Sequence, residues 1–99
     1  MEYEIKNGEI RVMLDKELDH HNAAMIKDKI DELIIEGQVK DVTFDFGKTT
    51  FMDSSGIGII MGRYKLVKSI NGKVFVCNVS GNIERILMIS GLYKIIERK

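Results

Sequence analysis

The feature that most constrains this chain is a regular alternation between two apolar patterns. Short runs with a two-residue period, typical of strands, alternate with longer segments in which apolar residues recur every three or four positions, as in helices. Such an alternation implies right-handed crossovers and a largely parallel sheet. We therefore predict an α/β fold, with a mixed, mostly parallel sheet and helices packed on it, in the order ββαβαβαβ. The predicted strands cover residues 3–6, 9–14, 39–46, 73–78 and 92–97, and the helices cover 20–36, about 54–70 and 81–89.

Glycine and asparagine mark the predicted turns, because the chain contains no proline. Asn7-Gly8 between the first two strand patterns predicts a tight hairpin. Asp19 predicts the cap of the first helix, and Gly37 predicts its end. The buried face of that helix is expected to carry Ala23, Ile26, Ile30, Leu33 and Ile34.

Length and composition limit the classes of protein to consider. A chain of 99 residues is long enough for one domain with one core, so we expect residues 1–99 to form a single domain. Lys+Arg and Asp+Glu number 15 each, which argues against direct nucleic-acid binding by a basic surface. No apolar run approaches the roughly 20 residues of a membrane span, and the start lacks a signal-peptide pattern. The single cysteine excludes an intrachain disulfide, and we expect a cytoplasmic protein with no membrane partner.

The segment after the third predicted strand, Phe51–Gly58, is the most informative local motif. Ser54 and Ser55 stand where a helical pattern begins, and Gly56, Gly58 and Gly62 follow within it. A glycine in a helix interior costs roughly 0.5–1 kcal/mol relative to alanine, so three of them need a compensating reason. Close approach by another molecule is one such reason. An exposed serine beside a bare backbone suggests a docking site that a modification can switch.

A helical wheel separates two sides of this second helix. The core side is expected to hold Ile59, Ile60, Leu66, Val67 and Ile70. Ser54, Gly58, Met61 and Lys65 fall on the outward side, with Ile57 at its border. An outward methionine beside glycines is an adaptable contact surface. The alternative is a solvated helix face with one exposed apolar residue, which is common.

Several other polar residues are candidates for metal binding or catalysis. Adjacent residues on a helix point about 100° apart, so His20 and His21 do not suit one metal ion, and we expect no metal site and no cofactor. An enzyme with Ser54 as nucleophile and one of these histidines as base would need a third orienting group. Ser54 lies in no Gly-x-Ser-x-Gly elbow, so we expect no catalytic residue and no enzyme. Arg63 falls toward the core side of the wheel. Two explanations are open: the side chain reaches past the apolar residues to a carboxylate, or the true orientation of the helix is slightly rotated from the wheel. Asp45 is expected to be structural, and Cys77 to be a small buried hydrophobe in a strand covered on both faces.

The segment Phe51–Gly58, followed by Gly62-Arg63-Tyr64-Lys65 eight residues after Ser54, resembles the signature of anti-sigma factor antagonists of the SpoIIAA type, which have a STAS domain. The resemblance extends over nearly the whole chain at colinear spacing. Members of the family usually have a helix after the last strand, and this sequence ends at Lys99. The other matching segments are residues 17–21, 76–80 and 90–96.

The resemblance implies a function. It implies that Ser54 is phosphorylated, and that the unphosphorylated protein binds an anti-sigma factor that is also a serine kinase of the ATPase fold. Binding frees a sigma factor to activate transcription, phosphorylation releases the partner, and a serine phosphatase resets the cycle. We expect mainly a monomer, with weak self-association allowed. The alternative is a passive STAS sensor or scaffold module that binds a nucleotide or small ligand without a kinase cycle. The expected partner-binding residues are Asp19, Asp53, Ser55, Gly56, Ile57, Gly58, Met61 and Lys65.

Overall fold

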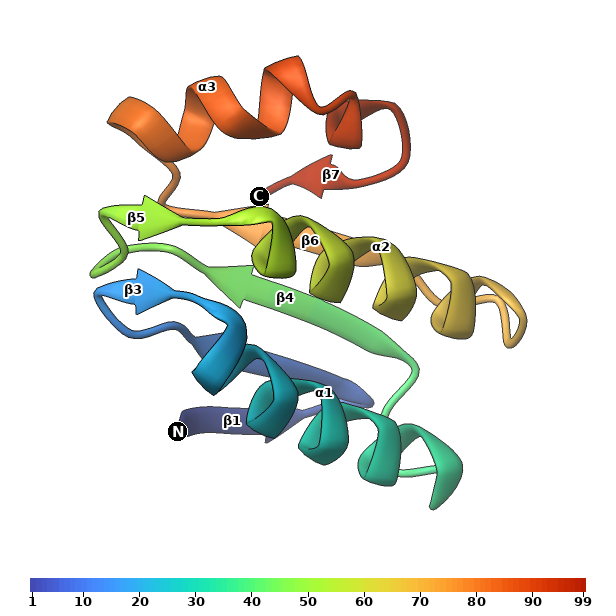
Figure 1. Ribbon diagram of the computed structural model, residues 1–99. Coiled ribbons are helices and arrows are strands. Elements are labelled where there is room, and N and C mark those ends of the chain that lie inside the picture. Colours follow the sequence, from blue (N-terminus) through green and yellow to red (C-terminus); the bar gives the residue numbers. More distant parts are fainter.

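A central sheet of five strands in the order β1-β2-β4-β6-β7 dominates the computed structural model, which describes residues 1–99 (Figure 1). β1 pairs antiparallel with β2, and every other pair is parallel. The prediction of a mixed, mostly parallel sheet is therefore confirmed, and the central strands and the helices follow the predicted order ββαβαβαβ. The strands are β1 (Glu2–Lys6), β2 (Glu9–Met13), β4 (Asp41–Asp45), β6 (Val74–Cys77) and β7 (Glu97–Arg98).

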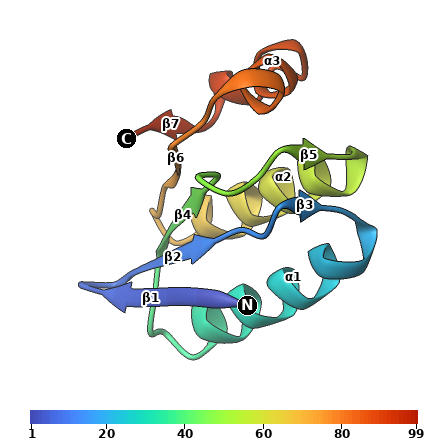
Figure 2. The same ribbon diagram turned by 90° about the vertical axis from the view of Figure 1, so that its left-hand side faces the viewer.

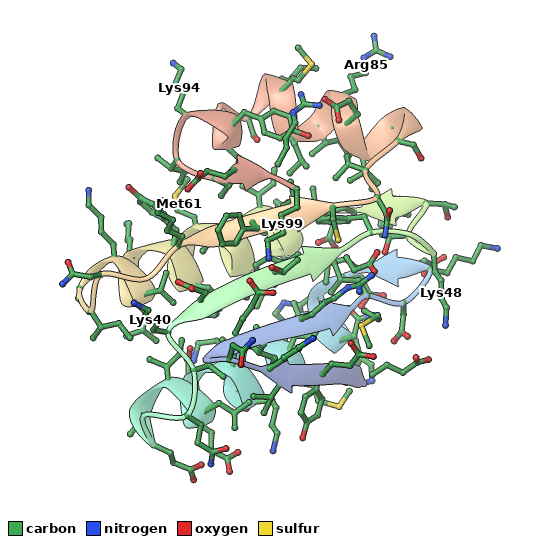
Figure 3. All side chains as sticks on the ribbon, turned by 180° about the vertical axis from the view of Figure 1, so that it is seen from behind. Lys40, Lys48, Met61, Arg85, Lys94 and Lys99 are labelled. Atoms are coloured by element: carbon green, nitrogen blue, oxygen red, sulfur yellow. The ribbon has the colours of Figure 1, made fainter.

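Three helices cover one face of this sheet: α1 (His20–Ile35), α2 (Ser54–Lys68) and α3 (Gly81–Ile89) (Figure 2). Each lies between two parallel strands, and right-handed crossovers bring successive helices to the same side. The opposite face carries charged side chains, among them Lys99 (Figure 3), which pairs with Glu9. That face is therefore polar, and the core lies between sheet and helices.

The core follows from the strand and helix periods. Ile10 and Val12 alternate with half-buried residues along β2, as a strand with one buried face requires. The central strand β4 adds Phe44, which is fully buried. From the helical side come the predicted face of α1 and, from the other two helices, residues such as Ile60 and Leu87.

The hairpin between β1 and β2 forms as predicted. Asn7 and Gly8 have φ angles of 52° and 78°, and two successive positive values are typical of the turn that joins tightly paired antiparallel strands. Asparagine and glycine adopt this conformation with the least strain.

A second, two-stranded parallel sheet was not predicted. β3 (Glu17–Leu18) pairs with β5 (Phe51–Met52), in the segments that precede α1 and α2. Two residues are too few to show a strand period in the sequence. We call this pair the ribbon.

Three other predictions were wrong. Residues 92–97 form a 3₁₀ helix, η1 (Leu92–Lys94), before the short β7, because a left-handed Gly91 (φ 78°) turns the chain so that Leu92 enters the core. Ile70 is exposed, since α2 ends at Lys68 and residues beyond it no longer follow the helical period. β6 is buried on one face only, which leaves Cys77 half-buried.

Candidate functional site at the starts of two helices

The ribbon brings the first residues of α1 and α2 together (Figure 1). Leu18 pairs with Met52, and the N–H of Asp53 donates to the carbonyl oxygen of Leu18 at 3.2 Å. Each strand of the ribbon leads directly into its helix. The starts of two helices that are 34 residues apart in sequence, at His20 and Ser54, therefore lie side by side.

Both helices begin with an aspartate cap. The Oδ1 atom of Asp19 accepts from the N–H groups of His21 and Asn22, and the side chain of Asn22 accepts from the N–H of Asp19, which completes a capping box. The predicted cap at Asp19 is confirmed. In α2 the cap is Asp53, whose Oδ1 accepts from the N–H of Ser55 at 2.8 Å. Because Asp53 caps the helix, Ser54 is its first residue. Ser54 is exposed.

The outward side of α2 has the composition that the wheel predicts. Ser54, Gly58, Met61 and Lys65 are exposed, and Ile57 is half-buried. Met61 has 37% of its surface accessible. This stripe continues from the exposed serine along the helix, so serine and methionine belong to one surface.

Gly56 was expected to be part of the docking surface, but it is buried. A Cβ atom at this position would lie 2.3 Å from Cγ of Met52 and 3.0 Å from Cδ2 of Leu18. The glycine therefore lets α2 approach the ribbon closely. Gly58 is different, since a Cβ there would meet no atom within 4 Å.

A groove runs between α1 and α2 beside the two helix starts, with a volume of about 280 Å³. Arg63 lines it and is 7% exposed. The guanidinium Nε lies 2.9 Å from Oδ1 of Asp31, so the predicted carboxylate partner is a residue of α1. The residues that line the groove are His20, Ala23, Ala24, Lys27, Ser55, Gly58, Ile59 and Arg63.

The groove was not predicted from the sequence, where only the buried face of the first helix is apparent from the apolar period. A signal was present, since His20, Ala23, Ala24 and Lys27 share one helical face on which the middle two side chains are short. A matching face on α2 holds Gly58. Two facing stretches of small residues leave room between helices.

Asp45 lies outside this site, at the end of β4. It accepts hydrogen bonds from Arg11, Asn78 and the N–H of Gly47, as expected of a structural residue. Burial alone would raise the pKa of its carboxyl group, but these hydrogen bonds and the nearby arginine outweigh burial and lower that pKa. Burial, and next the charge of Asp45, raise the pKa of the Cys77 thiol.

Comparison with known proteins settles the family. The sequence profile of the STAS domain matches residues 1–99. The chain belongs to the STAS domain family. Among curated relatives of this STAS domain is an anti-sigma F factor antagonist from Paenibacillus polymyxa, 41% identical over 95 residues, which covers 96% of this chain and 81% of that protein.

Solved structures agree with the STAS assignment. The anti-sigma factor antagonist SpoIIAA in its unphosphorylated form matches with a TM-score of 0.90 and 29% identity, over 99% of this chain and 86% of that one. The Bacillus cell fate determinant SpoIIAA in its phosphorylated form matches with a TM-score of 0.82 and 29% identity, over 99% and 89%. None of the helices in this STAS domain is long and apolar enough to span a bilayer.

Proposed function

We propose that this protein is an anti-sigma factor antagonist controlled by phosphorylation of Ser54. In its unphosphorylated form it binds an anti-sigma factor that is also a serine kinase, in the cytoplasm, and thereby frees a sigma factor. Phosphorylation by that kinase ends the association, and a serine phosphatase restores it. The names of the relatives support the regulatory role, and the exposed position of Ser54 at the start of α2 is the observation that supports its phosphorylation.

The position of Ser54 explains how a phosphate can act without unfolding the domain. A phosphate adds a charge of about −1.5 to −2 at neutral pH. At a helix start, free N–H groups and the helix dipole stabilise a negative charge by about 0.3–1 kcal/mol. The fold therefore tolerates the modification. The loss of binding arises at the interface, from bulk and from repulsion of acidic partner groups, and the adjacent Asp53 adds to the local negative charge.

The proposed contact surface combines both helix starts with the outward stripe of α2. From the capped starts come Asp19, Asp53 and Ser55, all of which are half-buried. Gly56 is left out because it packs against the ribbon. The remaining members are Ile57, Gly58, Met61 and Lys65.

Mass spectrometry after incubation with the cognate kinase and ATP tests the site of modification. We expect one phosphate on the wild-type protein, none on Ser54→Ala, and one on the matched control Ser55→Ala. Phosphate at another residue, or none at all, would count against the kinase cycle and favour a passive STAS module.

Binding measurements test the consequence of the modification. Ser54→Ala should bind the anti-sigma factor as the wild type does, and Ser54→Asp should bind more weakly. Both variants should unfold in urea like the wild type, because residue 54 is exposed at a helix start that favours negative charge. Unfolding of Ser54→Asp would contradict the interface explanation.

A further inference from the structure

We infer that the groove between α1 and α2 receives an acidic side chain of the anti-sigma factor, with Lys27 and Arg63 at its cationic end. This inference rests on the proposed function and names the chemistry of one contact within it.

No other part of the chain fills the groove. Ala23 and Ala24 line it from α1, and Gly58 and Ile59 line it from α2. A Cβ atom at Gly58 would meet nothing within 4 Å, so packing of the domain does not require glycine there. The short side chains keep open a hollow that suits the methylene stem of an acidic residue.

The charges in the groove favour a carboxylate ligand. Arg63 and Lys27 share one carboxylate, that of Asp31, at 2.9 Å from Nε and 3.2 Å from Nζ. The Nε of Arg63 and the Oδ1 of Asp31 are buried, yet neither makes a well-aligned hydrogen bond. Asp28 is 3.8 Å from Lys27, but its side chain is 79% exposed and it does not line the groove. Two cations of the groove therefore share one partly buried carboxylate, and a further carboxylate is the protein group that pairs best with a guanidinium.

The groove is also adjacent to the proposed phosphorylation site. Ser55 lines it, and Ser54 is the preceding residue at the exposed start of α2. A phosphate on Ser54 would repel an incoming carboxylate because both are negative. The group of the anti-sigma factor that this phosphate would repel is therefore the acidic side chain bound in the groove.

Binding of the anti-sigma factor to charge variants of the full chain tests the inference. Lys27→Glu reverses a groove charge on a side chain that is 52% exposed, and Lys27→Gln removes it with less change. Lys94→Glu, on η1 and outside the groove, is the matched control. We expect the Kd to rise roughly tenfold for Lys27→Glu and by less for Lys27→Gln, while Lys94→Glu binds like the wild type. Urea unfolding of each variant verifies that it is folded.

A double-mutant cycle separates repulsion in the groove from a general loss of affinity. In the Lys27→Gln background, Ser54→Asp should weaken binding by a smaller factor than in the wild type, because the acidic group is then held less firmly. Wild-type affinity of both Lys27 variants, equal weakening by Lys94→Glu, or strict additivity in the cycle would overturn the inference while leaving the proposed function intact. Failure of the wild-type protein to bind any anti-sigma factor would refute the proposed function, and the inference with it.

Discussion

At the scale of single residues, Asp45 joins three strands through one carboxylate. Its Oδ1 accepts from the N–H of Gly47 at 2.8 Å and from the side chain of Asn78 at 2.9 Å, and its Oδ2 accepts from Arg11 of β2. Asn78 follows β6 with a left-handed φ of 56°, a conformation that asparagine tolerates. A buried carboxylate with several donors is stabilised in its charged form.

Asp45→Asn tests this arrangement through the pH dependence of stability. The pKa of Asp45 is lower in the folded protein than in the unfolded chain, so its charge stabilises the fold above the unfolded pKa. That contribution is lost as the pH falls through the folded pKa. The variant should be less stable than the wild type by about 1 kcal/mol at pH 7. The difference in the free energy of unfolding between the wild type and Asp45→Asn should become smaller below about pH 4.

Urea unfolding at pH 7, 5 and 3 measures this gap. Glu2→Gln is the control, because Glu2 is exposed and pairs only with the exposed Lys48, so its gap should be small at every pH. A gap for Asp45→Asn that stays constant from pH 7 to pH 3 would contradict the role of the charge.

At the scale of elements, α2 contains glycines with opposite roles. Gly56 packs against Met52 of the ribbon, which is 4% exposed, whereas Gly58 faces the open groove. The first glycine is needed for close packing between helix and ribbon. The second weakens the helix and leaves room for another molecule.

Two alanine substitutions separate these roles. Gly58→Ala should stabilise the domain by about 0.5–1 kcal/mol through better helix propensity. Gly56→Ala should destabilise it by about 1–3 kcal/mol, because its Cβ would overlap a core side chain. Thermal or urea unfolding of both variants gives the two signs directly. Equal changes in stability for the two variants would contradict the view that close packing against Met52 requires a glycine at position 56.

At the scale of the whole molecule, two contacts between distant segments fix how α1 and α2 lie together. The ribbon joins Leu18 to Asp53 at the helix starts, and the ion pair of Asp31 with Arg63 joins the helices further along. Because the proposed surface and the groove both draw on the two helices, their geometry depends on these contacts. We therefore expect the stability of the domain and the proposed partner binding to be linked through these two contacts.

Removal of Arg63 tests the second contact. Arg63→Met should destabilise the domain by about 2 kcal/mol, because it leaves the partly buried carboxylate of Asp31 with Lys27 alone. Adding Asp31→Asn should recover part of the loss by removing that charge. Urea unfolding of the two single variants and the double variant measures the coupling, and additive losses would show that the pair contributes nothing specific.

Much of this site could be predicted from the sequence because its signals are local. The cap at Asp19, the start of α2 at Ser54 and the outward position of Met61 each depend on residues within one or two helical turns. The Asn7-Gly8 hairpin depends on two adjacent φ angles. Such features are set by backbone geometry and side-chain period, which the order of residues determines directly.

The remaining features were decided only by the tertiary structure. The ribbon places two helix starts together, although its strands are too short for any period to be visible. The burial of Gly56 depends on where Met52 lies, and the partner of Arg63 comes from a helix more than 30 residues earlier. Sequence alone therefore determined where α1 and α2 begin and that Ser54 and Met61 face outward on α2. Only packing between distant segments decided which of them meet, because a period describes one element and carries no information on its register against another.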